Sequence, residues 1–329
     1  MNIGFVGVGG VAQPHLQNLS KMPNVKISAV CDLQEDRAKK VAETYGATAF
    51  TDYKKMIRKG ALDAVYVCVI PAAHANIEMD LAKAGLPMYV EKPVHLDLNK
   101  CRKVIDQIAA KSVINAVGYH WRYTAASQAV HAFLQGRKAM MVQAYWYGGF
   151  PQVGWWRKMG LSGGQLVEQT THLVDMARYL AGEVHTVYAT ANTGTMTEWE
   201  GYDIHDTSVV TLQFDSGAIG QITSGCISDD PKGGHKTDIS IMGKNWLAWT
   251  NAGQATLSEA GQENRSVDSG QSWAEQLGNG DAAFVKAVQT REQSHILSSY
   301  ASGAQTLAIT LTGNKAIATH KEQKVPRLL

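Results

Sequence analysis

Short hydrophobic runs alternate with amphipathic, helix-like segments from the start of the chain to about residue 120. The runs predict buried strands, because a strand covered on both faces of a parallel sheet needs apolar residues in succession. Strands are expected at 3–8, 25–31, 64–70, 88–90 and 113–117, and helices at 15–19, 73–84 and 98–110, the last capped by Asp97. Strands that alternate with helices predict an α/β fold, a Rossmann-type doubly wound parallel sheet.

The pattern changes after about residue 122. Strand-like runs at 140–147, 186–192, 207–214, 218–226 and 237–242 follow one another with few helices between them. Asp215-Ser216-Gly217 has the composition of a hairpin turn between two of these runs. Helices are expected at 165–180, 282–289 and 304–319. We therefore predict two domains, 1–122 and 123–329, the second an α+β domain with a large, mostly antiparallel open sheet.

Composition narrows the possible partners. The chain of 329 residues carries 31 Lys and Arg against 29 Asp and Glu, a net charge of +2, which argues against nucleic-acid binding and against an anionic membrane surface. The 4 cysteines lie far apart, and no Cys or His spacing suits a metal, so no metal site is predicted. Without a visible secretory signal or membrane-length apolar run, we expect a cytoplasmic protein.

The first strand is followed by the turn Gly7-Val8-Gly9-Gly10-Val11-Ala12, a G-x-G-x-x-A pattern that leads into a helix. Gly7 allows the sharp turn, Gly9 lets the backbone approach a pyrophosphate, and Ala12 allows close packing of helix on strand. The N–H groups at the helix start favour phosphate charge. This context predicts a dinucleotide site that includes Gly10 and Val11.

Asp32 ends the second strand, about 25 residues after Gly7. Its carboxylate can accept hydrogen bonds from both ribose hydroxyls and would repel a 2′-phosphate. We therefore expect NAD as the cofactor rather than NADP. Arg37 is near enough in sequence to bind a 2′-phosphate, but we interpret it as a solvated arginine on a helix face.

The carboxyl ends of the later parallel strands carry further candidate residues. In open α/β sheets ligands bind at this edge, so Ile70, Pro71, Glu91 and Lys92 are expected beside the cofactor. His120 and Arg122 follow the last parallel strand. Arg122 can line the nicotinamide side of the cleft or act as a structural tether between the domains.

One predicted helix of the second domain, 165–180, carries the residues suited to acid–base chemistry. Glu168, His172 and Asp175 are spaced at i, i+4 and i+7, which places them within about 60° of one another on a continuous helix. Imidazole titrates near neutrality, so neutral His172 can take the proton of a hydroxyl. The ammonium of Lys92 can stabilise the alkoxide that develops, while Asp175 orients the substrate or His172 and Glu168 accepts from neighbouring hydroxyls.

The loop before this helix contains Trp155, Trp156 and Arg157. The two indoles can stack on the apolar face of a sugar or cyclitol ring, and Arg157 can bind a carboxylate or phosphate. A core-filling role for one tryptophan stays open at this stage.

Taken in their order along the chain, these motifs resemble those of the glucose–fructose oxidoreductase, inositol dehydrogenase and MocA family. The resemblance covers essentially the whole chain. It rests on the glycine turn, on a proline-x-x-histidine segment at Pro71 to His74, on Glu91-Lys92-Pro93, on the run from Gly118 to Tyr123, and on Gly163-Gly164 followed by Glu168, His172 and Asp175. It implies catalytic roles for Lys92, His172 and Asp175, and adds His74 to the cofactor segment. Many relatives have Asp where this chain has Glu168, so the longer side chain could reposition the substrate.

The resulting hypothesis is an NAD-dependent dehydrogenase that acts on a secondary hydroxyl of a sugar, sugar derivative or cyclitol. Two alternatives stay open: an enzyme that keeps NAD bound for a net non-redox reaction or for oxidoreduction between two sugars, and a non-catalytic dinucleotide-binding regulator. An exposed sheet face would favour a homodimer or homotetramer. The substrate, the carbon oxidised and the physiological direction are left open.

Overall fold

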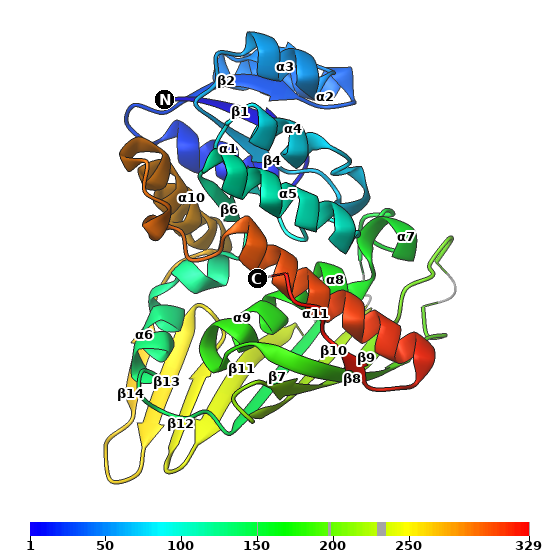
Figure 1. Ribbon diagram of the computed structural model, residues 1–329, viewed down its shortest axis with the longest axis vertical. Coiled ribbons are helices and arrows are strands. Elements are labelled where there is room, and N and C mark those ends of the chain that lie inside the picture. Colours follow the sequence, from blue (N-terminus) through cyan, green and yellow to red (C-terminus); the bar gives the residue numbers. More distant parts are fainter. Residues whose placement is uncertain (150, 197–198, 229–234, 329) are drawn as a thin grey trace. The chain divides into compact units, whose positions relative to one another are not determined.

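The fold is described from a computed structural model that covers residues 1–149, 151–196, 199–228 and 235–328. Contacts divide the chain into two compact units (Figure 1). Unit 1 comprises Met1–His120 and Gln271–Gly303, and unit 2 comprises Trp121–Gly270 and Ala304–Leu329.

Unit 1 is built on a six-stranded parallel sheet with the strand order β3-β2-β1-β4-β5-β6. Its strands are β1 (Asn2–Val6), β2 (Lys26–Cys31), β3 (Thr48–Phe50), β4 (Ala64–Val67), β5 (Met88–Val90) and β6 (Asn115–Val117). Chain order reverses at β1 and β4, and this is the topological switch at which such sheets bind ligands. All residues of β4 and β5 are buried, as expected for strands covered on both faces.

Helices connect these strands in the order expected of a doubly wound sheet. They are α1 (Ala12–Ser20), α2 (Glu35–Tyr45), α3 (Tyr53–Lys59), η1 (Pro71–Ala73), α4 (Ile77–Lys83) and α5 (Leu98–Lys111). Asp97 caps α5 as predicted, because its carboxylate accepts from the N–H groups of Asn99 and Lys100. The helix expected at 73–84 is instead split, since Pro71 opens the short turn η1 and α4 begins only at Ile77.

A late segment of the chain returns to unit 1. Helix α10 (Trp273–Thr290) and the turn η3 (Gln293–His295) pack with it, and Phe284 joins the core around β1 and β4. Asn18 of α1 donates to the carbonyl of Ala274 (2.9 Å). The division therefore differs from contiguous domains of 1–122 and 123–329, because the buried polar and apolar groups of α10 find their partners on α1 and the parallel sheet.

Unit 2 is built on a nine-stranded sheet with the order β14-β13-β12-β11-β7-β10-β9-β8-β15. Its strands are β7 (Met141–Gly149), β8 (Val184–Asn192), β9 (Thr207–Phe214), β10 (Ile219–Ser228), β11 (Lys236–Gly243), β12 (Trp246–Thr250), β13 (Gln254–Glu259), β14 (Arg265–Asp268) and β15 (Gln323–Lys324). All pairs are antiparallel except β7 with β10. The predicted hairpin joins β9 to β10, with Gly217 at φ +82°.

Helices cover one face of the nine-stranded sheet (Figure 1). The strands are contacted by α6 (Ala125–Phe133), α8 (Gln165–Glu168) and α9 (Thr171–Ala181), and α7 (Met159–Ser162) contacts α8. Unit 2 also holds the part of α11 (Tyr300–Thr319) that begins at Ala304. The predicted fold class, a Rossmann-type parallel sheet followed by a mostly antiparallel α+β region, is confirmed.

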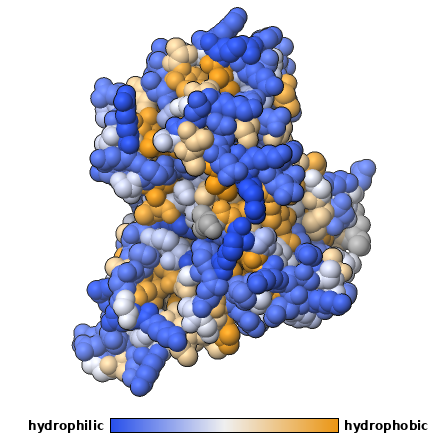
Figure 2. Space-filling view, viewed as in Figure 1, coloured by the Kyte–Doolittle hydropathy of each residue, from blue (hydrophilic) through white to orange (hydrophobic). Residues whose placement is uncertain are grey.

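Hydrophilic side chains cover most of the surface seen in Figure 2, and hydrophobic ones form smaller areas among them. Among the described residues, no helix has the length and hydrophobicity to cross a membrane.

Candidate functional site

The turn between β1 and α1 has the geometry that the glycine pattern predicts. Gly7 has φ +82°, and a Cβ atom there would lie 2.6 Å from the carbonyl oxygen of Cys68, so a side chain would clash with backbone. Cβ atoms at Gly9 and Gly10 would meet nothing within 4 Å. Val11 precedes α1 without a side-chain capping bond, and Ala12 is fully buried. The turn therefore leaves its glycine backbone and the helix start open to a phosphate group.

Asp32 lies at the end of β2 with its carboxylate oriented by backbone groups. The N–H of Val8 donates to Oδ2 (3.1 Å) and the N–H of Gln34 donates to Oδ1 (2.9 Å). Arg37 is 42% exposed, and its guanidinium lies 3.3 Å from Oδ2. Arg37 therefore pairs with Asp32 rather than being solvated alone, although its side chain stays partly exposed.

The residues of the segment from Ile70 to His74 lie in two different environments, one at the edge of the sheet and one in the interior. Ile70 and Pro71 begin the turn η1 beyond β4, at the ligand edge of the sheet. The His74 ring is fully buried, bonded to the carboxylate of Glu78 and 6.2 Å from the ring of His95. This burial gives His74 a role in holding the segment, while the backbone of Ile70 and Pro71 remains the part suited to face a cofactor.

Glu91 and Lys92 follow β5 at the same edge. Glu91 is 3% exposed, and its Oε2 accepts from the backbone N–H of Lys92 (3.2 Å). The Lys92–Pro93 peptide bond is cis. Gly118 is required beside this carboxylate, because a Cβ atom there would lie 2.1 Å from Glu91 Oε1. Glu91 thus fixes the backbone that carries Lys92 instead of binding a ligand in the open.

Glu91 also belongs to a buried cluster that the sequence did not reveal. His15 of α1 bonds through Nδ1 to Asp281 of α10 (2.6 Å) and through Nε2 to Glu91 (3.1 Å). Tyr66 donates its hydroxyl to Asp281 (3.1 Å), and Asn18 donates to the same carboxylate (3.2 Å). We call His15, Glu91, Asp281, Tyr66 and Asn18 the His15 cluster.

Two histidines of unit 1 differ in charge near neutral pH. Burial alone would lower the pKa of His15, but the carboxylates of Asp281 and Glu91 raise it to about 10. Burial lowers the pKa of His120 to about 4, against the opposing effect of Glu91. His15 is therefore an imidazolium held between two carboxylates, and His120 is neutral.

The helix predicted at 165–180 is interrupted just after its first acidic residue. Helix α8 ends at Glu168 and α9 begins at Thr171. The N–H of Thr170 bonds to the carbonyl of Gln165 (3.0 Å), a wider turn than an α-helix makes. The assumption that Glu168, His172 and Asp175 share one continuous helix face is therefore wrong, because the wide turn changes the direction of Glu168 relative to α9.

His172 and Glu168 nevertheless both lie in the interior of unit 2, at 8% and 9% exposure. The His172 ring stacks against Trp121 (centroids 6.1 Å apart, planes at 18°) and against Trp146 (5.9 Å, 23°). The two indoles are themselves stacked at 5.8 Å. The candidate base thus stands beside two flat apolar surfaces.

Asp175 is engaged by Arg122. The guanidinium Nε donates to Oδ2 and Nη2 donates to Oδ1, both at 2.7 Å, in the two-pronged geometry of strong arginine–carboxylate pairs. The hydroxyl of Thr306 also donates to Oδ1 (2.9 Å). Asp175 is 1% exposed. These contacts suit Asp175 and Arg122 to fixing α9 and the 120–123 turn, η2, rather than to contacting substrate or cofactor.

The tryptophan loop is held by contacts of the Arg157 side chain. Trp155 and Trp156 are half-buried and stacked at 6.4 Å. Arg157 donates to the carbonyl of Pro151 (2.9 Å), and its guanidinium lies over the ring of Trp199 (4.8 Å). Phe150, in the same predicted loop, lies outside the described residues. Arg157 therefore holds the loop, which leaves the indoles as its candidate ligand surface.

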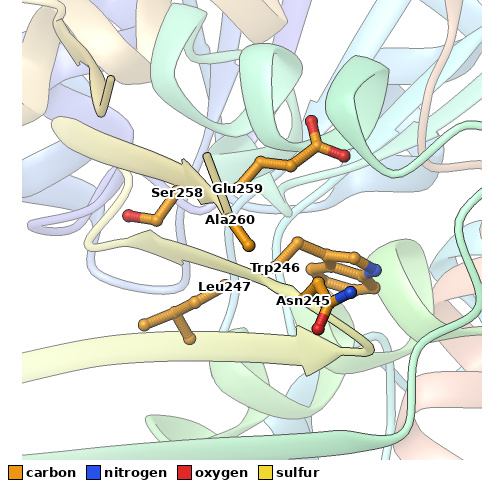
Figure 3. Close-up of a pocket in the computed structure, with 6 residues that line it drawn as sticks. All are labelled: Asn245, Trp246, Leu247, Ser258, Glu259 and Ala260. Atoms are coloured by element: carbon orange, nitrogen blue, oxygen red, sulfur yellow. The ribbon is translucent and has the colours of Figure 1, made fainter. Parts of the chain in front are cut away.

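A pocket of about 330 Å³ lies elsewhere in unit 2, at the ends of β12 and β13 (Figure 3). Its lining residues are Asn245, Trp246, Leu247, Ser258, Glu259 and Ala260. Glu259 pairs with Arg137 (2.9 Å). None of these residues is a predicted site residue, and the carboxylate is already neutralised, so we do not assign the chemistry to this pocket.

Two family models match the chain. An oxidoreductase family with an NAD-binding Rossmann fold, GFO/IDH/MocA, matches residues 1–119, and the GFO/IDH/MocA C-terminal domain matches residues 125–245. The first matched range contains the glycine turn, and the second contains His172 and its helix.

Curated relatives and solved structures agree with these models. The uncharacterized oxidoreductase YrbE of Bacillus subtilis is 28% identical over 67% of this chain and 65% of its own length. Myo-inositol 2-dehydrogenase of Thermotoga maritima is 30% identical over 68% of this chain and 67% of its own length. The aligned region thus spans about two thirds of these relatives. A structure of levoglucosan dehydrogenase with NADH and levoglucosan has a TM-score of 0.89 at 18% identity, covering 99% of both chains, which shows a shared fold.

Proposed function

Because the chain belongs to the GFO/IDH/MocA family of NAD-binding oxidoreductases, we propose that it is an NAD-dependent dehydrogenase acting on a secondary hydroxyl of a sugar, sugar derivative or cyclitol. The glycine turn fits the cofactor: Gly7 admits no side chain, and Gly9 and Gly10 leave the backbone open where a pyrophosphate would lie. Asp32, fixed by two backbone N–H groups, supplies the acceptor for the ribose hydroxyls.

Oxidation of a secondary alcohol needs a hydride acceptor and a base, and bound NAD supplies the acceptor. We assign His172 as the base, because a neutral imidazole can take the hydroxyl proton near pH 7. Lys92 stabilises the developing alkoxide through its ammonium group. Glu91 supports Lys92 by accepting from its backbone N–H (3.2 Å), so the lysine's backbone is fixed before the substrate arrives.

Several buried polar atoms of unit 2 that lack a hydrogen-bond partner support this class of substrate. Among the described residues, Gln165 Oε1, Thr170 Oγ1 and the indole N–H groups of Trp146 and Trp156 are buried and lack a hydrogen-bond partner. Buried donors and acceptors without partners are costly in a folded protein, so they favour a ligand rich in hydroxyls. Gln165 and Thr170 flank Glu168, and Trp146 stacks on His172. The named myo-inositol and inositol dehydrogenase relatives favour the same class.

An absorbance screen for NADH tests this function. We expect the intact protein to reduce NAD with at least one sugar, inositol or sugar acid, and to prefer NAD over NADP. Asp32→Ala should narrow that preference, because it removes both the ribose acceptor and the repulsion of a 2′-phosphate. Preference for NADP in the unmodified protein would overturn the assignment of Asp32.

Cofactor exchange separates the alternatives. A dehydrogenase must release NADH in each turnover, whereas an enzyme with permanently bound NAD would keep it through gel filtration. A dinucleotide-binding regulator needs neither Lys92 nor His172 for binding. NAD binding with no turnover of any polyol, unchanged by His172→Asn, would therefore favour a regulator.

We also propose a homo-oligomer formed through the uncovered face of the nine-stranded sheet. Strand register places several exposed hydrophobic side chains on this one face: Tyr147, Tyr188, Val209, Ile219 and Leu247, each 40–50% exposed. Exposed hydrophobic side chains gathered on one face often mark a protein–protein interface. Light scattering after size exclusion should give a dimer or tetramer, and Val209→Asp should shift it towards smaller species. A monomeric unmodified protein would refute this.

A further inference from the structure

Two adjacent residues, Trp121 and Arg122, engage two residues of α9 that are one helical turn apart. The Trp121 indole lies nearly parallel to the His172 ring, with centroids 6.1 Å apart and planes at 18°. Arg122 donates two hydrogen bonds of 2.7 Å to the carboxylate of Asp175. We call Trp121 and Arg122 the 121–122 clamp. All four side chains are less than 9% exposed.

The clamp is itself held from several directions. The carbonyl of Arg122 accepts from the Gln128 side chain (2.5 Å), which also donates to the hydroxyl of Tyr179 (2.8 Å). The Arg122 guanidinium lies 4.9 Å from the centre of the Tyr179 ring. Since both the backbone and the side chain of Arg122 are fixed, the position of its neighbour Trp121 is fixed as well.

The same network reaches the opposite side of Asp175. Thr306 of α11 donates to Asp175 Oδ1 (2.9 Å), and Arg178 donates to Thr306 (2.8 Å). Arg178 in turn pairs with Glu183 just beyond the end of α9. Asp175 is therefore enclosed by partners, and these contacts tie α9 to α11 and to η2 at the turn that follows His172.

We propose that the 121–122 clamp is a positioning device for His172: Arg122 fixes α9 through Asp175, and the Trp121 indole restricts the imidazole to one ring orientation. Trp146 supports the same ring from β7, with centroids 5.9 Å apart. The inference rests on the proposed role of His172 as base. It reassigns Asp175 from a catalytic residue to a positioning residue, since its carboxylate is already taken by Arg122 and Thr306.

The direct test reads the His172 ring itself. In full-length protein labelled with ¹³C-histidine, the His172 Hε1 resonance is identified by its loss in His172→Asn. Because the ring current of an indole shifts the resonances of nearby protons, Trp121→Leu should move this resonance, and Trp121→Phe should move it less. Trp273→Leu is the matched control, because Trp273 begins α10 in unit 1 and is 55% exposed. A His172 resonance unmoved in Trp121→Leu would overturn the proposal.

Kinetics supply the second readout. Displacing a reacting group by about 1 Å can lower a rate by roughly 10²-fold, so Trp121→Leu should lower kcat by about that factor and change KM much less. Trp121→Phe should recover part of the loss, and Trp273→Leu should leave kcat unchanged. Equal losses in Trp121→Phe and Trp121→Leu, with the melting temperature lowered equally, would show a purely structural role and contradict the proposal.

The outcomes separate this inference from the proposed function. Full activity in His172→Asn would refute the base, and the resonance shift would still report whether Trp121 orients the ring. Loss of activity in His172→Asn with an unmoved resonance in Trp121→Leu would keep the base and refute the clamp. If Trp121→Leu fails to fold, the smaller shift and smaller kcat loss predicted for Trp121→Phe decide the question.

Discussion

Each unit holds a buried ionic network beside a candidate catalytic side chain, but the two networks use different cations. In unit 1 the imidazolium of His15 lies between Asp281 and Glu91, next to Lys92. In unit 2 the guanidinium of Arg122 pairs with Asp175, one turn from His172. A guanidinium keeps its charge at every pH that a folded protein meets, whereas an imidazolium can lose its proton. The cation of unit 1's network can therefore lose its charge as the pH rises, whereas the cation of unit 2's network cannot.

The largest effect should follow from removing the shared cation of unit 1. His15→Ala leaves two buried carboxylates without their partner, and breaking such a pair costs about 3–5 kcal/mol. The free energy of unfolding, measured by urea denaturation at pH 7, should fall by this amount. The control is His185→Ala, because His185 is 49% exposed on β8. A loss below about 1 kcal/mol, the value typical of a surface pair, would show that the cluster is not ionic.

Removing the cation of unit 2 should cost nearly as much. Arg122→Leu leaves one buried carboxylate without its cation. We therefore expect the free energy of unfolding to fall by about 3 kcal/mol, towards the lower end of the same range. The loss should be the same at pH 6 and pH 9, since only a guanidinium is removed. Arg327→Leu is the control, because Arg327, Glu183 and Asp215 are only partly buried, at 38%, 35% and 50% exposure. A loss that changes with pH would break the contrast between the networks.

The pH dependence of stability tests the contrast in the unmodified protein. The folded pKa of His15 is raised to about 10, above the unfolded value of 6.5. Its contribution is therefore complete below pH 6.5 and is lost as the pH rises towards 10, with a slope of at most about 1.4 kcal/mol per pH unit. Denaturation midpoints between pH 6 and 10 measure this, and His15→Gln should remove the slope. Equal slopes in both proteins would contradict the assignment.

A smaller change sharpens the picture of the cluster. Tyr66→Phe removes one hydroxyl that donates to Asp281 (3.1 Å) and leaves the ring stacking with Phe5 and Tyr89 in place. We expect a loss of about 1.5 kcal/mol, typical of a hydrogen bond to a charged group. Hydrogen exchange should quicken in β4 and α10 while β9 stays unchanged. An unchanged free energy of unfolding in Tyr66→Phe would mean that the hydrogen bonds from His15 and Asn18 are sufficient for Asp281.

The same contrast shows what the sequence can predict. Local patterns predicted the parallel sheet, the glycine turn and the β9–β10 hairpin, because each depends on residues close together in the chain. The His15–Asp281 bond joins residues 266 positions apart, and no local pattern links them. A signal for α10 was present: Ser272 and Glu275 form a capping box, which places the helix start nine residues before the predicted 282.

The candidate site was predicted in its residue types more than in their arrangement. Helical spacing brought Glu168, His172 and Asp175 together, but the wide turn at Thr170 depends on tertiary packing and breaks that face. Arg122 and Asp175 were both singled out, yet their pairing could not follow from spacing, because they are 53 positions apart. Burial decides which charged residues can meet a ligand, and burial is a property of the fold.

Single-turnover hydride transfer tests the central claim most directly. With NAD and a sugar or cyclitol that the screen identifies, NADH formation is followed after rapid mixing for the unmodified protein, His172→Asn and the exposed control His185→Asn. Loss of a general base should slow the transfer by about 10²–10⁴-fold in His172→Asn and leave the control unchanged. Transfer at the full rate in His172→Asn would contradict the account.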